Sequence, residues 1–424
     1  MTWALTTIAA ALVLYATVSL RLQRLDVSAA MFFTTAGLLA GPGLGLLDVE
    51  IASEQVKLLA EVTLTLVLFA DAARISLPEL RREFAVPLRL LGIGLPLTIL
   101  AGAAAGVAVL PGVSLAEALV LAIMLACTDA ALGRAVVSDE RIPSRIRQGL
   151  NVESGLNDGI CVPLFFIAIA FAEAESGTVS GHSAAELVLE EIGYGLVGGV
   201  VAGLLGALAL RFADRHRLIE PHWLQILTAA TAMLAAAVAT GLGGSIFIAA
   251  FTGGFVFGAL RDATGDVTYL VDEGGELFNA VTFIVFGAVI LGPSLDDLTW
   301  ELALYAVLSL TVVRIVPVAL ALLGTGARRQ TVGFLGWFGP RGLASIVFAV
   351  ILLDEADLPH VRTLLLATTV TIAVSVYAHG LTARPLTERY VRWWGSHPHD
   401  AKPAMESVPA GTHRWRTPWA ARPS

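Results

Sequence analysis

Hydrophobic residues gather into thirteen blocks along the chain, and short polar connections separate these blocks. A helix needs about 20 residues to cross a hydrocarbon layer ~30 Å thick, so each block is predicted to be a transmembrane helix. The blocks lie at 3–20, 27–46, 55–73, 86–110, 115–137, 146–172, 186–212, 221–240, 244–260, 268–291, 299–323, 330–353 and 361–382. The polar–apolar alternation of a β-barrel is not seen. The pattern therefore predicts an all-α polytopic membrane protein with about thirteen transmembrane helices.

Two of these blocks contain residues that disfavour a continuous helix. Block 115–137 carries Thr128 and Asp129 in its middle, and block 330–353 contains the run "GWFGPRGL" around Arg341. Proline removes a backbone donor and glycine weakens a helix. The blocks are seven spans apart, so they cross the membrane in opposite senses. Interrupted helices in inverted halves point to the binding site of a transporter; two ordinary kinks are the alternative.

Composition and charge support a membrane protein and suggest its orientation. The chain is 56% hydrophobic and 15% charged, whereas soluble domains average about 25% charged residues. The formal charge is 27 − 35 = −8, but the arginines concentrate in alternate connections. The positive-inside rule then predicts an external N-terminus and a cytoplasmic C-terminus. We expect a multi-pass protein of the plasma membrane, the inner membrane in a bacterium.

The two ends and the two cysteines lead to simpler expectations. The first block lacks a basic leader and a cleavage site, so it is interpreted as a retained span. Residues 386–424 are polar and rich in proline, which predicts a disordered cytoplasmic tail. Cys127 and Cys161 both lie in apolar blocks and are expected to be free and buried.

Ionisable residues at membrane depth form the candidate chemistry. A charge there costs at least ~2.5–3.5 kcal/mol, and function usually explains it. The ionisable residues at this depth are Asp71, Asp129, Glu153, Asp158, Arg314 and Arg341. A second, shallower acidic group lies near the start of block 268–291 and consists of Asp272, Glu273 and Glu276.

Block 146–172 places its polar side chains in a helical pattern. Ser154 and Asp158 are four residues apart and share one helical face, while Glu153 and Asn157 lie on the neighbouring stripe. Asp129 can approach the same spot, where the positive N-terminal end of a half-helix would favour its carboxylate. We expect Glu153 to pair with Arg314, and Arg341 to neutralise the C-terminal ends of half-helices.

This set of oxygen ligands suits a small hard cation. Carboxylate, hydroxyl and backbone carbonyl oxygens are available from Asp158, Asp129, Ser154 and Thr128. A carboxylate held away from water can carry either a proton or a cation, and that competition is an exchange mechanism. Asn157 cannot titrate, so a single exchanging acid at Asp158 predicts electroneutral transport. Asp129 is a second candidate for titration.

At these residues the sequence resembles a known family. "NVESGLNDGICVPLF" is similar to the Glu-Ser-x-x-Asn-Asp signature of the monovalent cation/proton antiporter-1 family, the NhaP-like sodium/proton exchangers. "CTDA" at 127–130 resembles its Thr-Asp-Pro motif, and "GWFGPRGLASIVFA" resembles its broken Gly-x-Arg-Gly helix. "VLFADAARI" at 67–75 is similar to its third-span motif. The resemblance covers roughly residues 5–385.

The resemblance implies an inverted-repeat antiporter fold with two crossed discontinuous helices. It implies a transmembrane domain over 1–385, with a core at about 86–172 and 299–382, a dimerisation domain at about 1–73 and 221–291, and a linking helix at about 186–212. It also implies a homodimer and an elevator-like movement of the core. The implied ion-site residues are Thr128, Asp129, Ser154 and Asp158, with Asp71 and Asn157 nearby, and the implied structural pair is Glu153 and Arg314.

The chain departs from the family pattern at two positions. Ala130 replaces the usual proline, and Asp71 replaces a frequent glutamate, which favours a water-mediated contact to the ion. We expect exchange of Na+, with Li+ possible as substrate, for H+; a K+/H+ antiporter is the alternative. An intramembrane aspartyl protease and a channel are more remote readings. No nucleotide motif is present, so the expected partners are the lipid bilayer and a second subunit, with no nucleic acid and no cofactor.

Overall fold

The computed structural model describes residues 2–47, 53–75, 85–129, 132–177, 181–261, 267–397 and 403–407. Within these ranges the regular elements are all helical. The first half of the chain forms α1 (Thr2–Arg24), α2 (Ala29–Leu38), η1 (Leu39–Gly43), α3 (Glu54–Arg74), α5 (Ala85–Arg89), η2 (Leu90–Gly94), α6 (Leu95–Val109), α7 (Leu115–Met124), α8 (Arg134–Val137), α9 (Ser144–Ser176) and α10 (Gly181–Arg215).

The second half continues in the same way. It forms α11 (Pro221–Leu242), α12 (Ile246–Leu260), α13 (Tyr269–Val285), η3 (Phe286–Leu291), α14 (Gly292–Ser294), η4 (Leu295–Asp297), α15 (Trp300–Leu310), α16 (Val312–Ala321), α17 (Arg329–Trp337), α18 (Leu343–Glu355), α19 (Val361–Gly395) and α20 (Ala404–Ser407). Each predicted block coincides with one helix or with consecutive helical pieces. In the described part of the chain, eight helices are long and apolar enough to span a bilayer, so the exact number of crossings stays a prediction.

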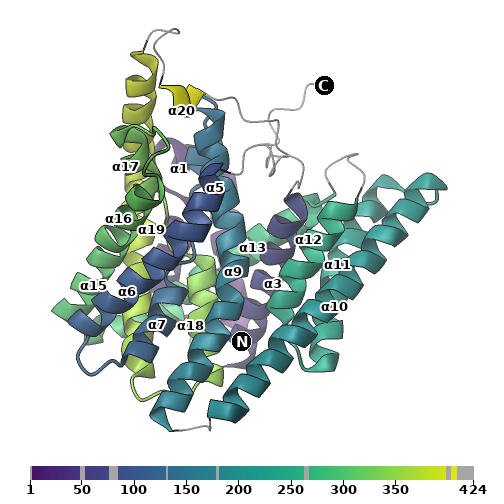
Figure 1. The fold of residues 1–424 in the computed structure, drawn as a ribbon, viewed down its shortest axis with the longest axis horizontal. Coiled ribbons are helices and arrows are strands. Elements are labelled where there is room, and N and C mark those ends of the chain that lie inside the picture. The colour runs from purple at the N-terminus through teal and green to yellow at the C-terminus, as the bar shows by residue number, and fades with distance from the viewer. Residues whose placement is uncertain are drawn as a thin grey trace.

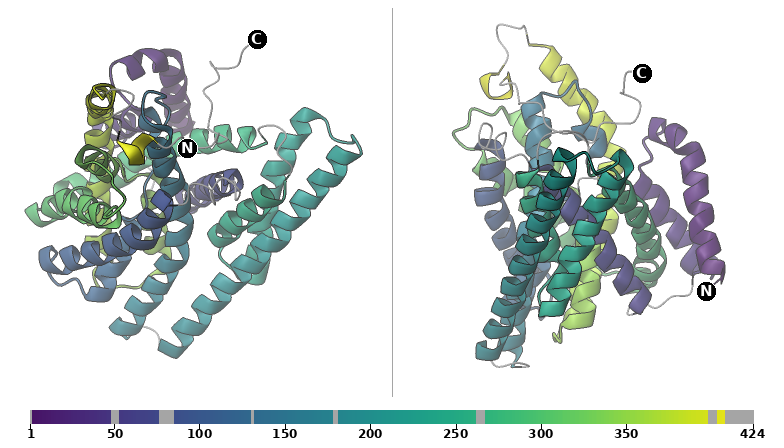
Figure 2. Two further views of the ribbon diagram at one scale, coloured as in Figure 1. Left: turned by 45° about the horizontal axis from the view of Figure 1, so that its top comes forward. Right: turned by 90° about the vertical axis from the view of Figure 1, so that its right-hand side faces the viewer.

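Helix α9 runs through the middle of the bundle (Figure 1). Helices α6, α7 and α15–α19 lie on one side of it, and α10, α11 and α12 lie on the other, packed against one another and against α3. Figure 2 shows α1 at the outer edge of the molecule. The long α9 therefore has neighbours from both groups and can carry side chains to the interface between them.

Both predicted interruptions are present. Helix α7 begins with a capping box formed by Ser114 and Glu117 and ends at Met124 after ten residues. Helix α8 begins only at Arg134. Helix α17 ends at Trp337 and α18 begins at Leu343. Position 130, where the family proline is replaced, lies outside the described residues.

The sequence pattern did not reveal four further irregularities. The π-helical segments η1, η2 and η3 interrupt predicted blocks 27–46, 86–110 and 268–291, and α15 and α16 are divided at Thr311. A π-helical turn inserts one residue without breaking the apolar pattern, so hydropathy alone does not detect it. Glycines and Pro42 mark some of these sites in the sequence.

The start of the expected tail at 386 is too early. Helix α19 continues to Gly395, because Tyr390 remains buried and packs on Phe334 of α17 with ring centroids 4.3 Å apart. A further short helix, α20, places the buried side chain of Glu406 against α17. Residues 398–402 and 408–424 lie outside the described residues, so disorder of the remaining tail stays a prediction.

Candidate functional site

The two interrupted helices meet at their breaks. The backbone N–H of Asp129 donates to the Pro340 carbonyl at 2.8 Å, which joins the α7–α8 break to the α17–α18 break. One carboxylate oxygen of Asp129 accepts from the N–H of Leu343, the first residue of α18, at 2.9 Å. The other accepts from the N–H of Leu132 at 3.2 Å. The Asp129 carboxylate thus lies at the positive end of a half-helix, as expected.

Arg341 makes the reciprocal contact. Its guanidinium donates to the carbonyls of Ala126 and Cys127, at 3.5 and 3.3 Å, just beyond the C-terminal end of α7. The side chain is fully buried, and the positive charge compensates the negative end of the half-helix, as predicted. The backbone N–H of Arg341 donates to the Ser375 hydroxyl of α19 at 2.6 Å, which fixes the second break, the one between α17 and α18.

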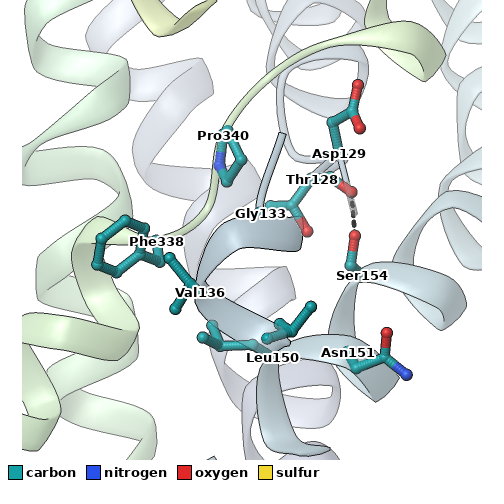
Figure 3. Close-up of a pocket in the computed structure, with 10 residues that line it drawn as sticks. Thr128, Asp129, Gly133, Val136, Leu150, Asn151, Ser154, Phe338 and Pro340 are labelled. Carbon is teal, nitrogen blue, oxygen red and sulfur yellow. Dashed lines mark hydrogen bonds between the residues drawn. The ribbon is translucent and has the colours of Figure 1, made fainter. Parts of the chain in front are cut away.

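Thr128, in the first break (between α7 and α8), accepts hydrogen bonds from two side chains of α9. The Ser154 hydroxyl donates to the Thr128 carbonyl, and the Asn157 amide donates to the Thr128 hydroxyl at 2.7 Å. Ser154 and Asn157 are therefore held on the same residue, although they lie on adjacent stripes of α9. Figure 3 shows the Ser154 hydroxyl directed at Thr128 while the Asp129 carboxylate points away from it.

Two pockets meet at Asp129. One, drawn in Figure 3, is lined by Thr128, Ser154 and residues of both breaks. The other contains the carboxylates of Asp158 and Asp71 and is closed by α13 and the start of α18. Asp129 lines both. The structure thus brings Asp71, Asp129 and Asp158 around one cavity, but it places Ser154 in the neighbouring pocket, because the hydroxyl is engaged by the Thr128 carbonyl.

Asp158 differs from Asp129 in its hydrogen bonding. The residue is 9% exposed, and among the described residues its Oδ1 atom has no hydrogen-bond partner. A buried carboxylate oxygen without a donor is costly unless a proton or a cation satisfies it. Asp158 therefore has an oxygen available to a ligand, and so does Asp272, whose Oδ1 atom also lacks a partner among the described residues of the same cavity.

The expected pair between Glu153 and Arg314 is present. Two hydrogen bonds of 2.5 and 2.9 Å connect the carboxylate and the guanidinium in a bidentate arrangement. Both side chains are 4% exposed. The guanidinium also lies against the second break, since a Cβ atom on Gly339 would be 2.9 Å from Arg314 Cζ. The pair therefore joins α9 to α16 beside the crossing and takes no direct part in the cavity.

Sequence reasoning missed three side chains that hold the second break. His379 is buried, and its Nε2 lies 2.9 Å from the carbonyl of Trp337, the last residue of α17. Ser375 is one turn away on α19 and holds Arg341, as described above. Ser345 donates to the Met124 carbonyl at 2.6 Å. The four-residue spacing of Ser375 and His379 in an apolar block was the available signal.

The fold and the site define a class: a polytopic helical membrane protein in which two interrupted helices cross beside buried carboxylates, as in secondary transporters. The family model described as sodium/hydrogen exchanger, transmembrane, matches residues 8–389. The chain belongs to this sodium/hydrogen exchanger family.

Individual relatives agree with the family assignment. The chain is 29% identical over 347 residues to the Na(+)/H(+) antiporter NhaP of Pseudomonas aeruginosa, covering 76% of this chain and 78% of that protein. It is 27% identical over 260 residues to an Na(+)/H(+) antiporter of Schizosaccharomyces pombe, covering 57% of this chain and 55% of the yeast protein. The chain thus spans about half the length of that yeast relative.

The architecture matches a solved structure. The sodium proton antiporter MjNhaP1 from Methanocaldococcus jannaschii, solved at pH 8, superposes with a TM-score of 0.74 at 22% identity. The match covers 92% of this chain and 98% of that chain. At this identity the likeness establishes the antiporter fold and leaves the cargo to be argued from the site.

Proposed function

We propose that the protein is a secondary transporter that exchanges Na+ for H+ across the membrane. One observation carries the proposal: Asp158, whose buried Oδ1 atom has no hydrogen-bond partner among the described residues, lines a cavity that Asp129 also lines, beside the crossing of two helix breaks. The names of the relatives point to the same pair of ions. Exchange of K+ for H+ at the same residues is the second candidate, because oxygen ligands of this kind bind either ion.

Exchange follows from competition at Asp158. A proton on the carboxylate removes its charge and one acceptor position, so the protonated acid binds Na+ poorly. The ionised acid attracts Na+ and, with other oxygens of the cavity, replaces part of the hydration shell. Proton and cation thus exclude each other, and each must leave before the other can bind.

We infer a stoichiometry of one proton for one Na+. The neighbour of Asp158 is Asn157, whose amide donates to Thr128 and cannot titrate. Both oxygens of Asp129 accept backbone N–H groups and hold the crossing together. A single exchanging acid makes the cycle electroneutral, with Asp129, Thr128 and Ser154 positioned to shape the site and Asp71 facing the same cavity.

Alternating access is assigned to a movement of the core helices (about 86–172 and 299–382) against the remaining bundle. We propose a homodimer formed through about 1–73 and 221–291, in the bacterial inner membrane, with the N-terminus outside and the C-terminus in the cytoplasm. The arginine-rich connections support this orientation. Labelling of single cysteines placed at either end, and cross-linking in membranes, would test the orientation and the dimer.

The decisive experiment uses purified protein in liposomes with an imposed pH gradient. Na+, Li+ and K+ are added in turn, and dissipation of the gradient is followed with a pH-sensitive dye. We expect the wild type to respond to Na+ and Asp158→Asn to be inactive. Asp297→Asn, at an exposed pair with Arg362, is the matched control and retains activity. A response to K+ alone would favour the second candidate, and full exchange by Asp158→Asn would refute the assignment of the exchanging acid.

A further inference from the structure

Two members of the shallower acidic group at the start of α13 line the same cavity as Asp158. Asp272 and Glu276 line that cavity together with Asp71 and Asp129. Asp158 also lines it, and its Oδ1 atom has no hydrogen-bond partner among the described residues. Five carboxylates around one cavity would hold a cation very tightly unless a basic side chain offsets part of their charge.

Arg74, in the last turn of α3, supplies a positive charge beside this cavity. Its Nη2 atom forms an ion pair with Asp272 Oδ2, and its Nη1 atom lies 3.4 Å from Asp71 Oδ1. The Thr268 hydroxyl donates to the same oxygen of Asp272 at 3.1 Å. The side chains of Arg74, Asp71 and Asp272 are 15%, 14% and 11% exposed, so the screening of their charges by water is reduced.

Asp71 connects this pair to the helix that carries Asp158. A Cβ atom placed on Gly155 of α9 would lie 3.6 Å from the Cβ of Asp71. Gly155 is three residues before Asp158, one turn away on the same helix. The guanidinium of Arg74, the carboxylate of Asp71 and the carboxylate of Asp158 therefore follow one another along one side of the cavity.

We propose that Arg74 is a positioning residue that sets the cation affinity of the cavity. Its single positive charge offsets one of the two negative charges of Asp71 and Asp272. This weakens the attraction of the cavity for Na+, so that the ion can be released. This inference rests on the proposed cation exchange and adds a residue that determines its affinity. Asp272 holds the guanidinium in place and adds negative charge to the wall.

The proposal predicts opposite effects for the two members of the pair. Arg74→Gln removes a positive charge and should lower the KM for Na+, whereas Asp272→Asn removes a negative charge and should raise it. For partly screened unit charges at about 10 Å we expect changes of about threefold to tenfold. Arg74→Lys retains the charge, so its KM should lie closer to the wild-type value than that of Arg74→Gln.

If the Arg74–Asp272 pair only stabilised the structure, the two substitutions would not have opposite effects on KM. Either substitution would then break the same contact, and both would shift KM in the same direction or only lower stability. The double variant Arg74→Gln with Asp272→Asn separates the two accounts further. It restores the net charge of the wall, so a charge effect returns KM towards the wild-type value.

The test is a Na+ titration of each variant in liposomes at fixed pH, with the fold checked by size-exclusion chromatography and thermal unfolding. Arg141→Gln, which removes an exposed arginine from its pair with Asp139, is the control and should leave KM unchanged. Opposite shifts of KM support the proposal; unchanged values or shifts of the same sign overturn it. Absence of Na+/H+ exchange by the wild type would instead refute the proposed function.

Discussion

Replacing Glu153 by glutamine tests the buried ion pair that joins α9 to α16. Glutamine fills nearly the same volume but leaves the guanidinium of Arg314 without a counter-charge at a position where both side chains are 4% exposed. Removing one partner of a buried pair costs about 3–5 kcal/mol, since the remaining charge is no longer compensated. We therefore expect Glu153→Gln to lower the free energy of unfolding by about that amount.

The neighbouring structure explains why relaxation cannot relieve this cost. Arg314 lies against the backbone of Gly339 in the second break, and its Nε atom already lacks a hydrogen-bond partner among the described residues. The guanidinium therefore cannot turn toward solvent without disturbing the crossing. A double variant, Glu153→Gln with Arg314→Met, removes both charges and should recover most of the lost stability.

Thermal unfolding in detergent, with and without Na+, measures both effects. Bound Na+ stabilises the folded protein by mass action, and this increment should be equal in the wild type and in Glu153→Gln. Asp297→Asn breaks an exposed pair and should cost about 0–1 kcal/mol. A Glu153→Gln protein that unfolds at the wild-type temperature but gains no protection from Na+ would place Glu153 among the ion ligands and refute the reasoning.

Two further substitutions test the crossing and the C-terminal segment. A Cβ atom on Gly342 would lie 2.7 Å from Cγ of Asp129. Gly342→Ala should therefore displace that carboxylate and reduce transport, measured as dye-monitored exchange, by about 100-fold. Gly333 has open space around it, so Gly333→Ala is the control and should leave exchange unchanged. Glu406→Ala loses two hydrogen bonds of 2.9 and 2.6 Å and should lower the free energy of unfolding by about 1–3 kcal/mol. Glu388→Ala, which breaks a solvent-accessible pair with Arg384, is its control in the same thermal assay. Equal stability of the two variants would contradict the prediction.

The elements that hydropathy governs could be predicted from the sequence. The thirteen blocks coincide with helices because each must bury its backbone polar groups internally at membrane depth. The two breaks were predictable from the glycines and proline around Arg341 and from the polar residues at 128–129. The charge pair of Glu153 and Arg314 was predictable because two isolated charges at that depth need each other.

Three-dimensional packing decided what could not be predicted. The helical spacing of Ser154 and Asp158 suggested one shared spot, but the Thr128 carbonyl draws the Ser154 hydroxyl into a separate pocket. The role of His379 depends on the end of α17 lying beside α19, which no local pattern encodes. Likewise, α19 extends past 386 because Tyr390 meets an aromatic ring of another helix.

The reciprocal contacts at the crossing have a consequence for voltage. The carboxylate from one break meets the N-terminal end of α18, and the guanidinium from the other break meets the carbonyls beyond α7. Each break thereby supplies the charge that the other lacks. Because these charges balance, the pair of crossed breaks can move through a medium of low dielectric constant without carrying a net charge across it. The membrane potential then exerts no net force on the paired charges of Asp129 and Arg341.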